Sequence, residues 1–181
     1  DVFWRNTVVG SNAIWRSANA SAVIATATVA DQRWQVVAVG DLDGDGRTDV
    51  VWRHAVSGED AVWRGGSAAN SVRLATVANS AWHIVGAGDF DEDGRQDLLW
   101  RNTSTGANSI WRSGNAATPM AIPGVTNLDW QVVGIGDFNL DEHADIVWRN
   151  VRTGANTIWR SGNPSSPQAM TGVTNPNWRI V

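Results

Sequence analysis

The feature that most constrains this chain is an internal repeat of 48 residues, which the tryptophans mark. The 12 tryptophans fall into three series, and every step within a series is 48 residues, with no insertion or deletion. The series stand at positions 4, 52, 100 and 148; at 15, 63, 111 and 159; and at 34, 82, 130 and 178. Internal repeats of roughly 20–50 residues indicate solenoids, propellers or arrays.

One repeat contains the signals of four short strands. The run 130–136 is apolar with glycines, as expected of an inner strand that neighbouring sheets approach closely. After an aspartate-rich turn come a second strand at 145–150, a third at 155–160 and a weaker fourth at 168–173. The Thr-Gly pair between the second and third strands suits a hairpin in which Gly154 takes the left-handed conformation. Helical periodicity is absent from the sequence.

Four strands in 48 residues match a propeller blade of about 40–50 residues. Apolar residues occupy both faces of the second strand, as in Leu98-Leu99-Trp100, which a blade between two others requires. A β-sandwich would predict irregular spacing and leaves the repeat unexplained. We therefore predict an all-β propeller of four-stranded antiparallel blades, with three complete units and one split between the termini. The predicted single domain, 1–181, divides into 1–33 (partial), 34–81, 82–129, 130–177 and 178–181 (the start of the next unit).

Composition excludes several classes of protein. The chain has no cysteine, so disulfides and thiolate sites are excluded. Its net charge of −4 provides no basic surface for nucleic acid. No apolar run reaches about 18 residues, so we expect no membrane insertion. Of the 18 acidic residues, 13 lie in the segments 41–49, 89–97 and 137–145, which points to local cation binding.

Two of these acidic segments have the spacing of a calcium loop. Carboxylates stand at loop positions 1, 3, 5 and 9, a glycine stands at position 6, and position 7 offers its backbone carbonyl. Calcium takes about six to eight oxygen ligands, and the glycine permits the positive φ that wraps the chain around an ion. The alternative is an Asp/Gly turn without metal, in which the carboxylates would repel one another. The predicted ligands are Asp41, Asp43, Asp45, Arg47 (backbone O) and Asp49 in the first loop, and Asp89, Asp91, Asp93, Arg95 (backbone O) and Asp97 in the second.

The third acidic segment is eroded. An amide replaces one carboxylate and Glu142 replaces the glycine, so we expect weaker calcium binding there, or none. Magnesium is disfavoured because it prefers water-rich octahedral sites. We expect the calcium to be structural. The weaker predicted ligands are Asp137, Asn139, Asp141, His143 (backbone O) and Asp145.

The pattern Gly-Asp-Phe-Asp-x-Asp-Gly-Arg-x-Asp-Leu-Leu-Trp-Arg-Asn at 88–102 resembles the FG-GAP/VCBS-type repeat of bacterial surface and secreted proteins. It is similar to the blades of integrin α-subunit propellers and of some fungal and bacterial propeller lectins. The resemblance covers essentially the whole chain and is specific in the loop and the second strand. It implies calcium at the loops, an extracellular or cell-surface setting and a binding role, and it implies no particular ligand.

Nine tryptophans are followed directly by arginine. One interpretation is packing: side chains of strand neighbours point to opposite faces, so Trp and Arg of adjacent blades stack in cation–π pairs worth about 0.5–2 kcal/mol each. The other interpretation is a repeated pocket that holds a sugar ring on an apolar platform. The residues predicted to line such pockets are Trp52, Arg53, Trp100, Arg101, Asn102, Trp148, Arg149 and Asn150.

No catalytic constellation is visible in the sequence. His54, His83 and His143 occupy unrelated repeat positions, and the paired carboxylates belong to the calcium loops. We therefore expect a binding module and not an enzyme. Its predicted function is calcium-stabilised, lectin-like carbohydrate binding between blades. The alternatives are a scaffold that binds a cell-surface protein or assembles with itself, and an ancillary domain of a secreted enzyme.

Closure of the ring stays open at this point. Residue 1 aligns with residue 49 and residue 181 with residue 37, so the C-terminal run 178–181 is a candidate partner of the N-terminal strand 1–6. By resemblance, such blades build larger rings, usually of seven. Two alternatives remain: a homo-dimer that completes a larger ring, or a chain that is a fragment of a longer propeller.

Overall fold

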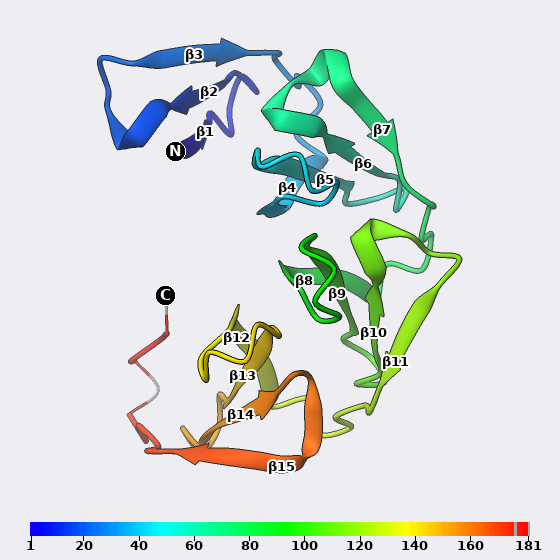
Figure 1. Cartoon of the computed structure of the whole chain (residues 1–181), viewed down its shortest axis with the longest axis vertical. Coiled ribbons are helices and arrows are strands. Elements are labelled where there is room, and N and C mark those ends of the chain that lie inside the picture. The colour runs from blue at the N-terminus through cyan, green and yellow to red at the C-terminus, as the bar shows by residue number, and fades with distance from the viewer. Residues whose placement is uncertain (176, 181) are drawn as a thin grey trace. The chain divides into compact units, whose positions relative to one another are not determined.

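Antiparallel strands make up most of the regular structure of the chain, which a computed structural model describes for residues 1–175 and 177–180. Contacts between residues divide the chain into two compact units. The first holds residues 1–41 and 45–80, and the second holds 42–44 and the chain from Ala81 onward. Each unit is built from separate sheets, whose strands are labelled in Figure 1.

The first unit contains a three-stranded sheet and a four-stranded sheet, and in both each strand pairs with its neighbour in the chain. The strands are β1 (Val2–Arg5), β2 (Asn12–Trp15), β3 (Val23–Thr26), β4 (Trp34–Gly40), β5 (Asp49–His54), β6 (Asp60–Trp63) and β7 (Ser71–Arg73). The short 3-10 turns are η1 (Arg16–Ala18), η2 (Arg64–Gly66) and η3 (Ala68–Asn70).

The second unit contains two four-stranded sheets with the same neighbour-to-neighbour pairing. The strands of the first are β8 (Trp82–Gly88), β9 (Asp97–Asn102), β10 (Asn108–Trp111) and β11 (Pro119–Ile122), with the 3-10 turn η4 (Arg112–Gly114) after β10. The strands of the second are β12 (Trp130–Gly136), β13 (Asp145–Asn150), β14 (Asn156–Arg160) and β15 (Asn163–Met170). The prediction of an all-β chain of four-stranded antiparallel blades is confirmed, and the N-terminal sheet has three strands.

The predicted strand positions are confirmed except for the last strand of the repeat. β12 and β13 cover 130–136 and 145–150, and β14 begins one residue later than expected, at Asn156. The fourth strand, expected at 168–173, is β15, which begins at Asn163. Ser161 and Gly162 have φ of 50° and 67° and turn the chain directly after β14, so pairing resumes at once, with Arg160 opposite Asn163.

The second strand of each four-stranded sheet forms the core of its blade. Every residue of β5, β9 and β13 is buried, which confirms that both faces of these strands are covered. Trp52, Trp100 and Trp148 are each only 1% exposed. Burial on both faces explains why these strands are apolar without alternation.

Glycines in the first strand allow close packing within the second unit. A side chain at Gly86 would come within 2.6 Å of Ile135 Cδ1, and one at Gly88 within 2.6 Å of Ala144 Cβ. The first strand of each four-stranded sheet also has a register shift in its middle. In β8 the shift lies between Ile84 and Gly86. The predicted close approach to inner-strand glycines is therefore confirmed.

The hairpin between the second and third strands depends on one left-handed glycine. Gly154 has a φ of 74°, as predicted, and its carbonyl accepts a hydrogen bond from the Val173 N–H at 2.9 Å. A Cβ at Gly154 would clash with the Val173 carbonyl oxygen. Only glycine fits this turn, since both the conformation and the space exclude a side chain.

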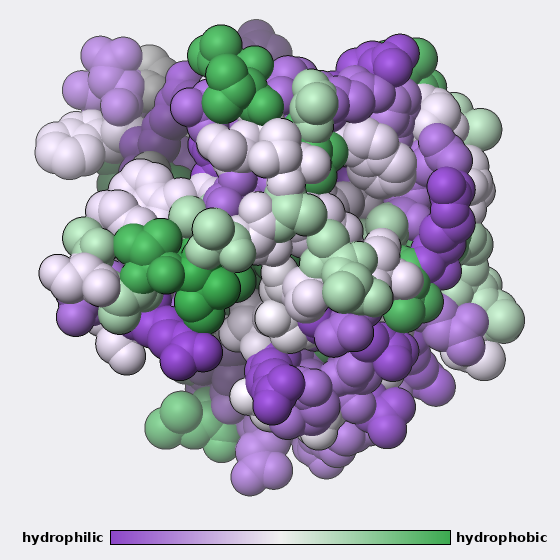
Figure 2. Space-filling model, turned by 90° about the horizontal axis from the view of Figure 1, so that it is seen from above, coloured by the Kyte–Doolittle hydropathy of each residue, from purple (hydrophilic) through white to green (hydrophobic). Residues whose placement is uncertain are grey.

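Apolar side chains also reach the surface. On the face drawn in Figure 2, hydrophobic residues lie singly and in small groups between hydrophilic ones. The most exposed large apolar side chains include Leu140 (88%), Val8 (83%) and Val56 (68%). Scattered exposure of this kind is normal for a folded surface.

Candidate functional site

The three aspartate loops connect the first strand of a blade to the second and share one backbone conformation. At loop position 4 the residues Gly44, Glu92 and Leu140 have φ of 77°, 60° and 62°. At position 6 the values are 79° for Gly46, 78° for Gly94 and 69° for Glu142. The predicted left-handed turn at position 6 is confirmed, whereas the equal requirement at position 4 was missed. The glycine at position 4 of the first loop is the signal that could have revealed it.

The second loop folds around its first carboxylate. Asp89 Oδ2 accepts the Gly94 N–H at 2.9 Å, and Asp89 Oδ1 accepts the Asp91 N–H at 3.3 Å. Asp93 Oδ1 accepts the Arg95 N–H at 2.9 Å. These side-chain-to-backbone bonds close the turn and bring the remaining carboxylates together.

Asp89, Asp91 and Asp97 form a group in which one ligand oxygen of each lies within 4.8 Å of the others. Asp91 Oδ1 is buried and has no hydrogen-bond partner among the described residues. Its other oxygen pairs with Arg112 Nε at 3.1 Å. A buried carboxylate oxygen without a donor costs free energy unless a cation balances it. The donor set of carboxylate oxygens fits a hard cation such as calcium.

Asp97 is the anchor of the loop. Its side chain is fully buried, Oδ2 accepts the Phe90 N–H at 3.0 Å and Oδ1 accepts the Ser113 N–H at 2.8 Å. The pKa of Asp97 is raised to about 6, chiefly by burial and also by the charges of Asp91 and Asp89, against the lowering effect of the two hydrogen bonds. A cation near the group would favour the ionised form of Asp97.

The first loop repeats this arrangement. Asp41, Asp43 and Asp49 form the corresponding group, Asp41 Oδ2 accepts the Gly46 N–H at 2.8 Å, and Asp49 Oδ1 accepts the Gly65 N–H at 2.8 Å. Asp45 Oδ1 accepts the Arg47 N–H at 2.8 Å. In both loops the structure thus brings together positions 1, 3 and 9. Position 5, Asp45 or Asp93, is exposed and outside the group.

The third loop keeps the turn and loses the carboxylate group. Asp137 Oδ2 accepts the Glu142 N–H at 3.0 Å. Asn139 Nδ2 donates to Asp141 Oδ2 at 2.8 Å, so an amide contacts the carboxylate directly. Asp145 makes the same two bonds as the second-loop anchor, from the Phe138 N–H at 3.0 Å and the Ser161 N–H at 2.8 Å. His143 Nδ1 lies 3.2 Å from the Phe90 carbonyl oxygen.

The predicted sugar-binding residues lie in the interior of the blades. Arg101 is 5% exposed and its guanidinium donates to four acceptors, the Gly106, Val125 and Trp130 carbonyls and Asn108 Oδ1, at 3.0–3.2 Å. Arg149 and Arg53 are 5% and 6% exposed. The guanidinium carbon of Arg101 lies 4.8 Å from the centre of the Trp148 ring, which supports the packing interpretation.

The predicted asparagines shape turns. Asn102 Oδ1 accepts the N–H groups of Ser104 and Thr105, both at 3.0 Å, and Asn150 accepts the corresponding pair at 3.1 and 2.9 Å. Both asparagines are buried. The burial of these columns leaves little of their side-chain surface accessible, and sugar binding there stays a prediction.

The first unit has an aromatic cavity of about 230 Å³, which Trp52, one of these predicted residues, helps to line. Its lining residues are Val29, Trp34, Trp52, Ala61, Trp63, Ser71 and Arg73. The Trp34 and Trp63 series were visible in the sequence. The sequence does not show that Trp34, Trp52 and Trp63 line one cavity, because that depends on how their strands pack in the folded chain.

Comparisons with known families agree with the repeat. Residues 89–148 match the FG-GAP-like repeat and residues 33–63 match the FG-GAP repeat. No curated protein matches the sequence. Within the described residues, no helix has the length and hydrophobicity needed to cross a bilayer.

Proposed function

Since this chain is an FG-GAP repeat protein, we propose that it is a secreted, calcium-stabilised binding module whose ligand is carbohydrate. FG-GAP repeats typify extracellular propeller-type binding proteins. The role is recognition and not catalysis.

The calcium proposal is supported by the second loop. Asp89, Asp91 and Asp97 gather their oxygens within 4.8 Å, and one of these oxygens is buried without a donor. Calcium would neutralise this group and join the two ends of the loop. Binding to the folded state alone stabilises it by about 2.7 kcal/mol per site at a free concentration of 100 times Kd.

Calorimetric titration of the chelator-treated protein with calcium tests this proposal. We expect binding at the first two loops and a rise in Tm when calcium is added. Magnesium at the same concentration is the control and should give a smaller rise. An unchanged Tm with calcium and with chelator would contradict structural calcium.

The carbohydrate proposal depends on the first-unit aromatic cavity. Trp34 is half-buried and offers apolar ring surface, the buried Trp52 and Trp63 form the inner wall of the cavity, and Ser71 and Arg73 supply polar groups at the rim. Both rim residues are exposed. Aromatic surface with a few polar groups suits a sugar ring, which has apolar C–H faces and hydroxyls at its edge.

A glycan array, run with calcium and with chelator, tests the sugar proposal. A binding glycan should lose most of its affinity for Ser71→Ala/Arg73→Ala, because both polar contacts are removed. Arg33→Ala is the matched control, since Arg33 is exposed and outside the cavity. Equal binding by the control and the double variant would place the sugar elsewhere.

A scaffold that binds a cell-surface protein is the second candidate. It is favoured by the burial of the Trp-Arg pairs at 52–53, 100–101 and 148–149 in the blade interior. The absence of any bound glycan at high protein concentration would favour the scaffold over the lectin. An ancillary domain of a secreted enzyme is the third candidate.

A further inference from the structure

In the first unit a histidine replaces the asparagine that caps the turn after the second strand of the repeat. The cap of the other repeats is Asn6, Asn102 or Asn150, whose side-chain oxygen accepts the backbone N–H groups two and three residues further along. The corresponding residue at the end of β5 is His54. Its Nδ1 accepts the Ser57 N–H at 2.9 Å, so the ring takes over the role of the amide. Unlike an amide, an imidazole can take up a proton between about pH 5 and 8.

The contacts of the His54 ring define its neutral form. Since Nδ1 accepts a backbone N–H, it carries no proton in the neutral ring, and the proton is on Nε2. Nε2 lies 3.4 Å from Asp31 Oδ2, which is an acceptor. The side chain is buried, so these neighbours rather than water satisfy both nitrogens. The bond from the Ser57 N–H therefore exists only while Nδ1 is unprotonated.

The hydroxyl of Ser57 offers the ring a second partner. Ser57 Oγ lies 2.9 Å from His54 Nδ1 and 3.0 Å from Glu59 Oε2. A charged ring with a proton on Nδ1 can donate to this hydroxyl, and the hydroxyl can donate to the carboxylate of Glu59. One serine thus serves the neutral ring through its N–H and the charged ring through its Oγ. Because Nδ1 cannot accept and donate at once, the two arrangements exclude each other.

Two carboxylates face His54, and each is already paired with an arginine. Asp31 pairs with Arg33 at 2.7 Å, and the hydrogen bonds from Arg33 hold the pKa of Asp31 well below its ordinary value. Glu59 pairs with Arg73 of β7 at 2.8 Å, and the hydrogen bond from Arg73 lowers the pKa of Glu59. Both carboxylates therefore stay ionised in the range in which an imidazole titrates, so the charge of this cluster changes at His54.

The neighbouring positions of β5 and β6 hold one further group that titrates in the same range. Arg53 and Asp60 form a buried ion pair at 2.7 Å. Burial raises the pKa of Asp60 to about 6, against the lowering effect of the hydrogen bond from Arg53. Side chains of neighbours in a strand point to opposite faces, so this pair lies on the other face of the sheet from His54. A test of His54 must therefore leave Asp60 in place.

The capped turn contacts the first-unit aromatic cavity through two of the residues that line it. The Trp34 ring lies 5.3 Å from the His54 ring, with 74° between the ring planes. Arg73 lines the same cavity and binds Glu59. A charged His54 that reaches Glu59 through the Ser57 hydroxyl shares this carboxylate with Arg73. A change at His54 is thus transmitted to the cavity from both contacts.

We propose that His54 is a proton-operated switch of the turn 54–59. Above about pH 7 the neutral ring caps the turn through the Ser57 N–H. Near about pH 5 the charged ring releases this N–H, donates to Ser57 Oγ and draws Glu59 away from Arg73. Acid thereby loosens Arg73 and shifts Trp34, which changes the cavity that this unit offers to a ligand. The inference goes beyond the proposed function and depends on neither calcium nor sugar.

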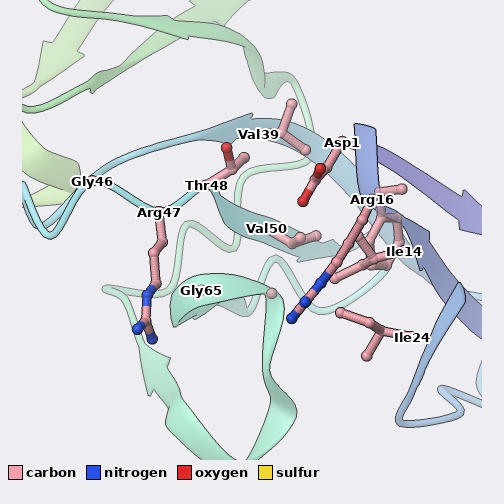
Figure 3. A pocket seen from close by; sticks show the side chains of 12 residues that line it. Asp1, Ile14, Arg16, Ile24, Val39, Gly46, Arg47, Thr48, Val50 and Gly65 are labelled. Atoms are coloured by element: carbon pink, nitrogen blue, oxygen red, sulfur yellow. The ribbon is translucent and has the colours of Figure 1, made fainter. Parts of the chain in front are cut away.

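Nuclear magnetic resonance of the isotope-labelled whole chain, titrated from about pH 8 to about pH 5 with chelator present, tests the proposal. At the upper end, the nitrogen resonances of the His54 ring should show a bare Nδ1 and a protonated Nε2. On acidification the Ser57 amide proton should move upfield, because it loses its acceptor, and its midpoint should equal that of the ring. The Trp34 indole N–H should shift with the same midpoint. The Ile24 amide is the internal reference, since it belongs to another sheet and lines the larger cavity of this unit, drawn in Figure 3.

His54→Asn is the matched variant, because asparagine caps the other repeats and cannot take up a proton, while Asp60 is retained. The Ser57 amide and the Trp34 indole should lose their common pH response in this variant, and the turn should stay capped throughout. Ser57→Ala keeps the N–H and removes the hydroxyl, so the Glu59 carboxylate carbon should no longer follow the titration of His54.

Two outcomes would overturn the proposal. One is a pH response of unchanged size in His54→Asn, which would assign the response to Asp60 or to another group. The other is a neutral His54 ring that carries its proton on Nδ1. The tautomer and the shared midpoint are measured in the wild type, so they decide the matter even if a variant does not fold.

Discussion

The second and third aspartate loops lie in one unit, have one backbone conformation and differ in chemistry. Both keep an aspartate at the first position that accepts the position-6 N–H, and both keep an anchor aspartate that accepts two backbone N–H groups. Only the second brings three carboxylates together. The aspartates at positions 1 and 9 therefore build the turn in both loops. The aspartate at position 3, present only in the second loop, completes a carboxylate group that a cation would neutralise.

The third loop keeps the same turn without a group of three carboxylates. The side-chain amide of Asn139 donates a hydrogen bond to the carboxylate of Asp141, where a cation would otherwise balance the negative charge. The loop carries two left-handed residues with side chains, Leu140 and Glu142, against one in the second loop, Glu92. Left-handed backbone costs about 1–2 kcal/mol per residue with a side chain. The eroded loop is therefore the more strained of the two.

The largest expected effect tests what the loops share. Asp97→Ala and Asp145→Ala each leave two buried or partly buried N–H groups without an acceptor, so each should lower the free energy of unfolding by about 3 kcal/mol. Urea denaturation with chelator present is the measurement, and a matched control is Asp93→Ala, at an exposed position. A large loss in the second loop alone would show that the two anchors do not play the same structural part.

The next effect tests what the loops do not share. Asp91→Asn gives the second loop the residue that stands at position 3 of the third, and it should remove most of that loop's calcium-dependent stabilisation, about 2.7 kcal/mol at 100 times Kd. Calorimetry should then count one calcium fewer per chain. Asn139→Ala is the control and should leave the count unchanged, and a lower count in this control would show that the third loop also binds calcium.

The smallest effect concerns strain. Glu142→Gly removes a side chain from a left-handed position and should raise the free energy of unfolding by about 1 kcal/mol. Gly94→Ala in the second loop should lower it by a similar amount, as measured by thermal unfolding with chelator. If Glu142→Gly is neutral, contacts made by the glutamate compensate for its conformation.

Much of the fold could be read from local pattern, because strands, turns and loops repeat with the tryptophans. The aspartates at positions 1, 3 and 9 and the left-handed Gly154 needed no tertiary information. Whether Trp52 and Arg101 are buried or exposed could not be predicted in the same way. Alternating Trp and Arg in a strand fits both packing between blades and exposure in a ligand pocket. The deciding acceptors of Arg101, such as the Trp130 carbonyl, lie 24 and 29 residues away. The first-unit aromatic cavity likewise requires three tryptophan series to converge in space.

The reach of the blade arginines has a consequence for the timing of folding. Arg5, Arg101 and Arg149 each donate to the carbonyl of a tryptophan 29 residues further along, at 3.1, 3.1 and 3.3 Å. On a ribosome, such a bond can close only after that tryptophan has left the exit tunnel. We therefore expect nascent chains to gain protease resistance in steps of one repeat, each step delayed until the next tryptophan emerges, and resistance that grows smoothly with chain length would contradict this order.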